Sequence, residues 1–304
     1  MYDVIVIGGG PAGITAAVTA INRRLETLIV AEHWGGQTEY FMDLEDADVS
    51  TVMTGEELLS RFRQQLDYLI FCRRFDRVTQ VSPEGDYFRV VTRDGDCYEA
   101  QSLVLATGAK PERLEVSGEE RLAGHGLSYS VVTHGSLFLG KRVAVVGGYQ
   151  RAQLAALELA RYAHHVCLVA PGLLPAELPL VKTLRRTPNI TLYEAATVCE
   201  VRGERYVEGI LIETVDGVRL DLPVKGVFVK LWRRPNSELV RDWIDLDAEN
   251  RVKVNLYGAT SHPGVFAAGD VTHISENVLV HMGEGAQAAI EAHSYLLAQW
   301  GDSP

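Results

Sequence analysis

Cysteine is scarce in this 304-residue chain, and its four cysteines form no recognisable pair. Cys72, Cys97, Cys167 and Cys199 each stand alone among apolar or strand-forming residues, and no two of them have C-x-x-C spacing. A redox dithiol or a zinc site would need closely spaced cysteines or other ligands. We therefore expect no metal site, and we expect the four thiols to be buried and structural.

Long apolar runs and an excess of basic charge are also missing. No apolar stretch approaches the roughly 18 residues that a membrane-spanning helix needs. Acidic residues outnumber basic ones by 40 to 29, and the net charge of −11 disfavours non-specific binding to nucleic acid. The first apolar stretch begins almost at the amino terminus, so we expect no signal peptide and a cytoplasmic location. The chain is 47% hydrophobic and 23% charged, which is typical of a globular protein with room for two domains.

The strongest positive signal is the stretch Val-Ile-Val-Ile-Gly-Gly-Gly-Pro-Ala-Gly, residues 4–13. Four β-branched residues in a row predict a strand that is buried on both faces, inside a parallel sheet. The strand runs into Gly8-x-Gly10-x-x-Gly13, and an Ala-rich helix is predicted over residues 11–21. In a dinucleotide fold these glycines allow a tight turn, a close approach to the pyrophosphate and close packing of helix on strand. The helix N-terminus then offers N–H groups to the phosphates.

The next predicted strand, residues 27–30, is followed by two further candidate binding features. Glu32 lies at the sequence distance at which an acidic side chain accepts the ribose hydroxyls of a dinucleotide. Because Glu32 lies beyond the apolar run, a solvated loop carboxylate is the alternative interpretation. Gly35-Gly36-Gln37 permits another close approach of the backbone to a ligand, with an amide able to bond a heterocycle.

The same order of elements occurs twice along the chain. A strand, a glycine turn, a helix and a strand are followed by a hairpin and a buried strand, with hairpin turns at Asp94-Gly95 and again at Asp216-Gly217. The second glycine turn is Gly147-Gly148-Tyr149, after a β-branched strand over residues 142–146. The repeat predicts an α/β protein with two Rossmann-like, three-layer ββα dinucleotide-binding domains.

At this level the whole chain resembles the low-molecular-weight thioredoxin reductase family of flavoproteins. The matching segments are Gly8 to Gly13, Gly35-Gly-Gln37, Ala106-Thr-Gly108, Gly264-Val-Phe-Ala-Ala-Gly-Asp270 and Gly283-x-Gly-Ala-Gln-Ala-Ala. The resemblance implies an FAD-dependent oxidoreductase and, by analogy, a homodimer. It also implies an FAD-binding domain over residues 1–112 plus 240–304, with the second, NAD(P)H-type domain inserted at 113–239.

The resemblance further assigns roles to individual residues. The FAD pyrophosphate is expected over the first glycine turn, Gln37 against the flavin ring, and Asp270 against the ribityl chain or phosphates. The last helix is expected to begin near Asn277 and to point its N-terminus at the flavin. The complete set expected to bind FAD is Gly8, Gly10, Pro11, Ala12, Gly13, Glu32, Gly36, Gln37, Val78, Thr107, Gly108, Gly269, Asp270, Asn277 and Val278.

The sequence departs from the family where the family carries Cys-x-x-Cys-Asp. The residues present there are Ser130-Val131-Val132-Thr133-His134. Disulfide exchange needs a sulfur nucleophile and a sulfur leaving group, so thioredoxin reduction through an internal dithiol is excluded. His134 stands in place of the family's acid and is a candidate proton shuttle for the flavin. The alternative is an ordinary loop histidine.

The second nucleotide site is altered as well. Tyr149 puts a phenol where the family has the glycine that admits the pyrophosphate, and residues 170–176 lack the arginines that bind a 2′-phosphate. Trp232 adds a second aromatic ring at the end of the neighbouring strand. NADPH in its usual pose is therefore not expected. Gly147, Tyr149 and Trp232 form a candidate second ligand site, whose rings either fill the vacated cleft or stack on a second FAD or another nucleotide.

These observations predict an FAD oxidoreductase that uses an unusual electron partner. The partner is a protein carrier such as a ferredoxin, or a second flavin or nucleotide bound in the inserted domain. An acidic carrier would need a local basic surface, for which the candidates are Lys225, Lys230, Arg233, Arg234 and Arg241. Scattered solvated charge is the other interpretation of these cations. The alternative function is a non-catalytic flavin-binding module for redox sensing or interaction.

Overall fold

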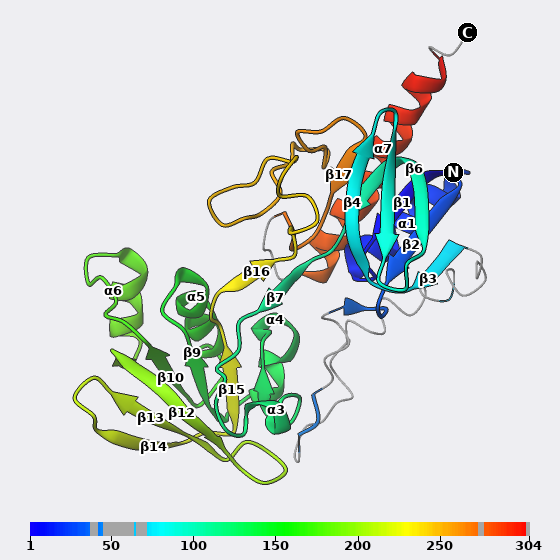
Figure 1. Cartoon of the computed structure of the whole chain (residues 1–304). Coiled ribbons are helices and arrows are strands. Elements are labelled where there is room, and N and C mark those ends of the chain that lie inside the picture. Colours follow the sequence, from blue (N-terminus) through cyan, green and yellow to red (C-terminus); the bar gives the residue numbers. More distant parts are fainter. Residues whose placement is uncertain (37–41, 45–63, 65–71, 273–276, 302–304) are drawn as a thin grey trace. The chain divides into compact units, whose positions relative to one another are not determined.

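The structure, a computed structural model, describes residues 1–36, 42–44, 64, 72–272 and 277–301 (Figure 1). The chain divides into two compact units. Unit 1 comprises Met1–Glu39, Met53–Lys110 and Arg234–Pro304, and unit 2 comprises Tyr40–Val52 and Pro111–Arg233. The long segment of unit 2 thus runs from Pro111 to Arg233. The inserted domain that the sequence predicts has the bounds 113–239.

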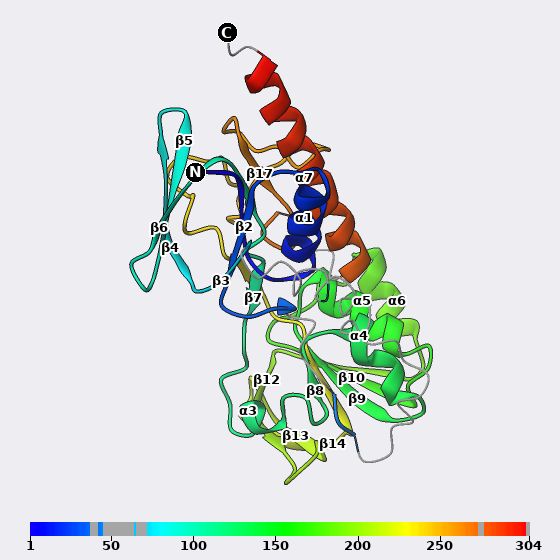
Figure 2. The ribbon, with the colours of Figure 1, turned by 90° about the vertical axis from the view of Figure 1, so that its right-hand side faces the viewer.

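Unit 1 is built on a parallel sheet with the strand order β3-β2-β1-β6, and β17 lies beside β6. These strands are β1 (Tyr2–Ile7), β2 (Thr27–Ala31), β3 (Arg73–Phe75), β6 (Cys97–Leu105) and β17 (Val265–Ala267). An antiparallel extension, β4 (Val78–Glu84) and β5 (Tyr87–Thr92), pairs with the first half of β6. Helices α1 (Pro11–Asn22) and α7 (Val278–Gly301) pack side by side on one face of the parallel sheet (Figure 2).

Strand β1 is buried on both faces, as its four β-branched residues predict. Val4 and Val6 pack with α1 and α7, whereas Ile5 and Ile7 pack on the opposite face with β4, β5 and Val240. None of these four side chains is more than 3% exposed. Each buried side chain of this size contributes about 1.5–3 kcal/mol. The strand is therefore firmly held at the point where it enters the first glycine turn.

Unit 2 repeats this plan, with the parallel strand order β11-β10-β9-β15-β8. The strands are β8 (Leu127–Ser128), β9 (Arg142–Val146), β10 (His165–Ala170), β11 (Ile190–Glu194) and β15 (Gly226–Val229). One face is covered by α5 (Gln150–Leu159) and α6 (Pro179–Arg186), with the short helices α4 (Val131–His134) and η4 (Gly135–Phe138) beside them. The other face is covered by the antiparallel sheet of β12 (Ala196–Arg202), β13 (Gly209–Thr214) and β14 (Arg219–Pro223), near α3 (Glu119–Leu122). Two Rossmann-like ββα units are therefore confirmed.

Two short strands carry the chain between the units. These are β7 (Ala109–Pro111) and β16 (Arg233–Pro235), which pair as a two-stranded sheet. Residues 42–44 also belong to unit 2, although the predicted FAD domain includes them. Met42 is 5% exposed in the core beside α5, and the Asp43 N–H donates to the Gly124 oxygen at 2.7 Å. Residues 42–44 differ from the prediction because the apolar Met42 side chain packs in the core of unit 2.

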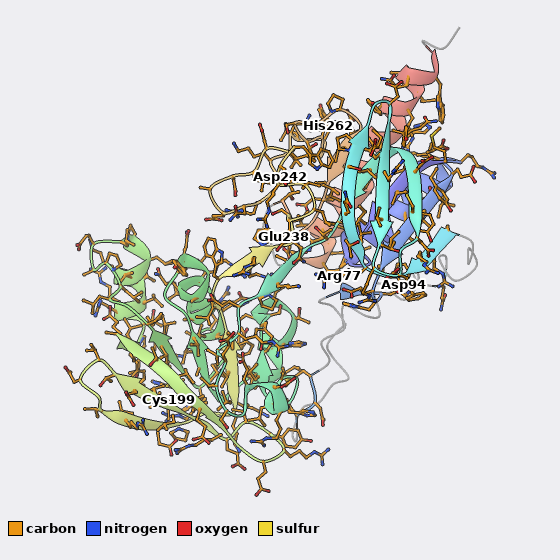
Figure 3. The ribbon with its side chains drawn as sticks, viewed as in Figure 1. Arg77, Asp94, Cys199, Glu238, Asp242 and His262 are labelled. Carbon is orange, nitrogen blue, oxygen red and sulfur yellow. The ribbon has the colours of Figure 1, made fainter. Side chains whose placement is uncertain are left out.

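The cysteines correct one expectation. Cys72 and Cys167 are buried as expected, but Cys97 is exposed and Cys199 is half-buried. Cys97 is the first residue of β6, next to the hairpin turn, where the sheet has not yet been covered. Cys199 lies on β12, in the antiparallel layer of unit 2 (Figure 3). Within the described ranges no helix has the length and apolar character needed to cross a membrane, and no metal-binding cluster of side chains occurs there.

Candidate functional site

The first glycine turn, between β1 and α1, has no room for a side chain at Gly8, Gly9 or Gly13. A Cβ on Gly8 would lie 2.1 Å from the Ala106 oxygen, and a Cβ on Gly13 would lie 1.9 Å from the Gly8 oxygen. Gly8 also has a φ of +118°, which disfavours any other residue. A Cβ on Gly10, in contrast, would meet no described atom within 4 Å. Gly8 and Gly13 therefore allow close packing of strand and helix, while Gly10 borders open space.

The N-terminus of α1 begins at this open space. Gly10 is the N-cap residue, Pro11 occupies the first turn, and no side chain among the described residues caps the helix. Ile14 is the residue whose N–H bonds back to the Gly10 oxygen, at 2.9 Å. An uncapped helix start offers N–H donors and the positive end of the helix dipole to an anion. The turn therefore fits the diphosphate of a dinucleotide.

The next predicted segment packs directly on this turn. The Gly35 N–H donates to the Gly9 oxygen at 2.7 Å, and a Cβ on Gly36 would lie 3.1 Å from the Gly10 Cα atom. Gly36 has a φ of +56°, so its conformation favours glycine. The predicted contact of Gln37 with the flavin lies outside the described residues.

The segment after β6 is held by a residue that the sequence did not single out. Asn236 Nδ2 donates to the Thr107 oxygen at 2.7 Å, and Thr107 Oγ1 donates to the Asn236 oxygen at 2.7 Å. The Asn236 N–H donates to the Gly108 oxygen at 2.9 Å. Because Ala106 lies against Gly8, this clamp fixes the Thr107–Gly108 backbone beside the first turn.

The end of β17 reaches the same place. Gly269 has a φ of +80°, and a Cβ on it would lie 3.1 Å from the Ala12 Cβ. Gly285 of α7 also approaches Ala12, since a Cβ on it would lie 2.1 Å from the Ala12 oxygen. Asp270, which follows Gly269, is 8% exposed. The structure therefore brings a buried carboxylate close to the start of α1.

The beginning of α7 holds this segment with side chains. The Gly269 N–H donates to Glu284 Oε2 at 2.8 Å, and His281 Nε2 lies 3.1 Å from Asp270 Oδ1. Asn277 Oδ1 accepts the N–H groups two and three residues further along the chain, at 3.0 Å and 3.3 Å. Asn277 therefore caps α7, and Val278 is the first helical residue. Sequence reasoning missed His281 and Glu284, although their i, i+3 spacing places them on one helix face.

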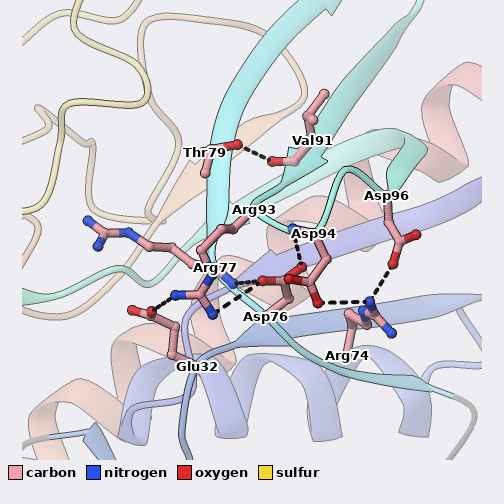
Figure 4. Close-up of polar contacts among 9 residues, drawn as sticks. All are labelled: Glu32, Arg74, Asp76, Arg77, Thr79, Val91, Arg93, Asp94 and Asp96. Carbon is pink, nitrogen blue, oxygen red and sulfur yellow. Dashed lines mark hydrogen bonds and ion pairs between the residues drawn. The ribbon is translucent and has the colours of Figure 1, made fainter.

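Glu32 follows β2, and Val78 is the first residue of β4. Glu32 Oε1 lies 3.1 Å from Arg93 Nη1 (Figure 4). Both side chains are exposed, Glu32 by 40% and Arg93 by 59%, so this ion pair is compatible with a ribose acceptor and with a solvated loop carboxylate alike. Val78 is 7% exposed in the core, so a contact with a cofactor would come from its backbone.

Asp76 positions Arg93 for this ion pair. Its carboxylate is fully buried, and Arg93 Nη2 lies 3.6 Å from its Oδ1. It accepts the N–H groups of Arg77 at 2.7 Å and Asp94 at 3.1 Å (Figure 4). The Thr92 hydroxyl beside it, these amides and the Arg93 guanidinium hold the pKa of Asp76 below its usual value.

The second glycine turn has nearly the same backbone conformation as the first. Its N-cap residue, Tyr149, has φ −74° and ψ 166°, compared with φ −77° and ψ −177° at Gly10. Gly147 has a φ of +147°, and within the described part of the chain α5 has no side-chain cap. Where Gly10 borders open space, unit 2 carries the Tyr149 side chain, which is 63% exposed.

The structure brings Tyr149 and Trp232 together, as the neighbouring strand ends predict. Their ring centroids lie 5.7 Å apart with an interplanar angle of 62°. Trp232 is 38% exposed, so the pair faces solvent. Both rings therefore present apolar surface at the end of the parallel sheet of unit 2.

The dithiol position of the family is occupied by two hydroxyl groups. Ser130 Oγ and Thr133 Oγ1 lie 3.0 Å apart, and Ser130 also caps α4 by accepting the Thr133 N–H at 3.3 Å. His134 is 7% exposed, and its Nδ1 lies 2.7 Å from Ser128 Oγ. This contact makes His134 part of the packed interior of unit 2. Its role as a proton shuttle stays a prediction.

Two of the five cations suggested as a docking surface are buried. Lys230 is 3% exposed and its Nζ donates to the Tyr129 oxygen at 2.8 Å, while Arg233 is 7% exposed. Lys225 precedes β15, whereas Lys230 follows that strand. Buried cations present little charge to a partner protein, so Lys230 and Arg233 do not contribute to the basic surface that sequence proximity suggests.

Comparison with known proteins supplies the family. The profile of the family described as pyridine nucleotide-disulphide oxidoreductase matches residues 2–292. The chain is 33% identical over 301 residues to a Bacillus subtilis (strain 168) protein described as NADH dehydrogenase, with 97% of this chain and 59% of that protein covered. It is 33% identical over 300 residues, with the same coverage, to a component of the alkyl hydroperoxide reductase of Staphylococcus epidermidis (strain RP62A). The chain thus spans 59% of the length of these curated relatives.

A solved structure resembles the chain over its whole length. The thioredoxin reductase from Streptococcus pyogenes MGAS5005 matches with a TM-score of 0.86 at 30% identity, covering 98% of this chain and 99% of that one. Membership of the matched family implies FAD binding, and the first glycine turn, the uncapped α1 and the buried Asp270 fit that cofactor. The chain belongs to the pyridine nucleotide-disulphide oxidoreductase family and has the thioredoxin reductase fold.

Proposed function

We propose that this oxidoreductase exchanges electrons between FAD in unit 1 and a second planar carrier, a flavin or another nucleotide, held by unit 2. The observation that carries the proposal is the exposed pair of Tyr149 and Trp232 at a glycine turn of unchanged backbone conformation. FAD, when bound, supplies one- or two-electron transfer. The chain's own residues supply binding and orientation.

In unit 1, the first glycine turn and the start of α1 would hold the diphosphate of FAD. Two requirements of a dinucleotide site are met there, since Gly10 borders open space and α1 has no side-chain cap among the described residues. The buried Asp270 carboxylate would accept hydroxyl groups of the ribityl chain. Glu32 would accept ribose hydroxyls while it is held by Arg93.

Neither of the family's usual electron routes is supported in this chain. Ser130 and Thr133 provide hydroxyls at the dithiol position, and a hydroxyl does not undergo disulfide exchange. At the second nucleotide turn, Tyr149 occupies the space that corresponds to the open space beside Gly10. A dinucleotide diphosphate in the usual pose would meet this side chain.

The aromatic pair favours a planar ligand over an acidic protein carrier. Tyr149 and Trp232 expose 63% and 38% of their surface, and aromatic rings gain about 0.5–1.5 kcal/mol from stacking beyond area burial. A ferredoxin-like carrier would approach a chain of net charge −11, and the burial of Lys230 and Arg233 removes two of the five candidate cations. The planar ligand is therefore the class that we favour.

NADH is the pyridine nucleotide to compare with this proposal. One relative is described as an NADH dehydrogenase, and residues 170–176 here contain no cation for a 2′-phosphate. NADH lacks the 2′-phosphate, so its binding in an altered pose would not require a cation in residues 170–176, as NADPH binding would. Its oxidation rate is therefore measured alongside the other carriers.

The first experiment counts the bound cofactors. Holoprotein purified without added flavin is denatured, and released flavins and nucleotides are identified by chromatography and quantified against protein. We expect about two planar cofactors per chain, of which one is FAD. The Trp232→Ala variant should retain FAD and lose the second cofactor. A ratio of one FAD per chain with no second nucleotide would contradict the proposal.

The second experiment identifies the carrier. The flavin is reduced photochemically, and its reoxidation by ferredoxin, oxygen and a quinone is followed together with its reduction by NADH and NADPH. We expect slow reduction by NADPH. Rapid oxidation of NADPH would contradict the inference that the second site no longer accepts NADPH in its usual pose. No reaction with any carrier would favour a non-catalytic flavin module.

A further inference from the structure

We propose that His281 is a positioning residue of the flavin site, which holds the Asp270 carboxylate in place from α7. His281 Nε2 lies 3.1 Å from Asp270 Oδ1. The inference rests on the proposed binding of FAD to unit 1, because Asp270 is the side chain assigned to the ribityl chain. It adds a residue that the family resemblance did not single out.

Both members of the pair are buried. Asp270 and His281 are each 8% exposed, which is unusual for ionisable side chains. A buried carboxylate without a charged or hydrogen-bonding partner carries a large free-energy penalty, so it reorients or takes up a proton. The His281 imidazole lies at ion-pair distance from this carboxylate, and in the proposal this contact restricts the orientation of the carboxylate.

The backbone of the same segment is held from the next residues of the helix. Glu284, three residues after His281, accepts the Gly269 N–H at 2.8 Å through its Oε2. The two side chains share one face of α7 because of their i, i+3 spacing. One helix face therefore controls both the amide before Asp270 and the carboxylate of Asp270.

This face also belongs to the part of α7 that meets the diphosphate turn. Gly285 packs on the backbone of Ala12, and Gly269 approaches the Ala12 side chain. Glu284 on α7 and the start of α1, whose first turn contains no acidic residue, lie beside the segment that carries Asp270. Fixing Asp270 here fixes a carboxylate beside the site that the FAD diphosphate would occupy.

The test measures FAD affinity in five forms of the apoprotein and in one control variant. Wild type, His281→Ala, His281→Gln, Asp270→Asn and the double variant His281→Ala/Asp270→Asn are titrated with FAD, and quenching of flavin fluorescence reports the dissociation constant. His293→Ala is the matched control, because His293 lies on the same helix outside the described contacts of the site. Thermal unfolding of each apoprotein reports whether the fold is intact.

We expect His281→Ala to raise the dissociation constant about tenfold, the order of effect for loss of a group that orients a direct ligand contact. His281→Gln should restore most of the affinity, because its side-chain amide still donates to a carboxylate. In the Asp270→Asn background His281→Ala should have no further effect, since a residue that acts only through Asp270 has nothing left to position. His293→Ala should bind FAD as the wild type does.

Two results would overturn the inference while FAD binding by the wild type stands. One is an unchanged dissociation constant in His281→Ala, and the other is an equal loss with and without the Asp270 carboxylate. If His281→Ala does not fold, a His281→Gln variant that folds but binds FAD no better than Asp270→Asn also overturns it. A wild-type apoprotein that does not bind FAD would instead overturn the proposed function, on which this inference depends.

Discussion

Single side chains decide what the two glycine turns of this protein admit. Gly10 and Tyr149 have nearly the same backbone angles, yet one borders open space and the other carries an exposed phenol. The difference between the turns is therefore one of side-chain volume and not of backbone conformation. This makes the two positions exchangeable in an experiment.

Exchanging the residue types at Gly10 and Tyr149 tests whether side-chain volume decides what each turn binds. We expect Gly10→Tyr to fold, with a free energy of unfolding of the apoprotein changed by less than about 1 kcal/mol, because φ is negative and no described atom lies within 4 Å of its Cβ. Its affinity for FAD should fall at least about tenfold, since the ring enters the diphosphate space. Tyr149→Gly should bind NADH more tightly than the wild type.

Fluorescence titration of both variants measures these affinities. Gly8→Ala is the matched control, since its Cβ would lie 2.1 Å from the Ala106 oxygen and its φ is +118°. It should destabilise the apoprotein by about 1–3 kcal/mol, as overpacking does. Undiminished FAD binding by Gly10→Tyr would place the diphosphate elsewhere.

Asp76 provides a pH-dependent contribution to stability. Its folded-state pKa is lowered, chiefly by the Thr92 hydroxyl, relative to an unfolded value of about 3.9. A lowered pKa stabilises the fold at pH values above the unfolded pKa, and this contribution is lost as the pH falls through the folded pKa. We expect Asp76→Asn to be less stable than wild type at pH 7, with the difference shrinking below about pH 4.

Urea unfolding of both proteins between pH 3 and pH 7 measures this difference. Asp96→Asn is a suitable control, because Asp96 is a half-exposed carboxylate in the turn between β5 and β6, whose Asp94 N–H donates to Asp76. A difference that stays constant over the whole range would show that Asp76 acts through shape alone.

At the scale of elements, α4 carries a pair of hydroxyls at the position where the family resemblance implies a Cys-x-x-Cys pair. Ser130 caps this short helix, and its Oγ lies 3.0 Å from Thr133 Oγ1, across one turn. A disulfide needs a sulfur–sulfur distance of about 2.05 Å, which small side-chain rotations could supply from this starting point. The local backbone therefore still suits a dithiol.

The variant Ser130→Cys/Thr133→Cys should therefore form an intramolecular disulfide on mild oxidation. Thiol titration after denaturation should find two fewer free thiols in the oxidised than in the reduced double variant. The single variant Ser130→Cys should show no such loss. If the double variant keeps all its thiols, the helix start does not hold the two positions in a bridging geometry.

At the scale of the whole molecule, net charge limits the choice of protein partners. The chain carries a net charge of −11, and two cations that could have offset it locally are buried. Association with an acidic electron carrier is therefore opposed by long-range repulsion, which salt screens over about 10 Å at 0.1 M. A small planar ligand is less affected by this repulsion.

The salt dependence of electron transfer tests this argument. With an acidic ferredoxin as donor we expect a slow second-order rate that rises between 20 and 300 mM NaCl. Stopped-flow absorbance of the flavin measures the rate, and a neutral quinone, whose rate should not change, is the control. A rate that falls with added salt would reveal a basic surface elsewhere on the chain.

The elements that the sequence predicts well depend on local patterns. Four β-branched residues make β1 a buried strand, and the period of two with Asp-Gly turns makes both hairpins. The roles of Gly8 and Gly13 are also predictable, because only a residue without a Cβ fits at these positions. A Cβ would lie 2.1 Å from a backbone oxygen at Gly8 and 1.9 Å from one at Gly13. The doubling of this pattern was sufficient to predict two Rossmann-like units.

The amino-acid sequence by itself thus determined the fold, the family and the chemical loss of the dithiol, because strand period, glycine turns and sulfur are properties of neighbouring residues. Only the tertiary structure decided that His281 meets Asp270, that Arg93 meets Glu32 from 61 positions away, and that Lys230 and Arg233 are buried. These contacts join side chains of different elements or loops, and the packing of helices and strands determines which side chains meet and which remain in water.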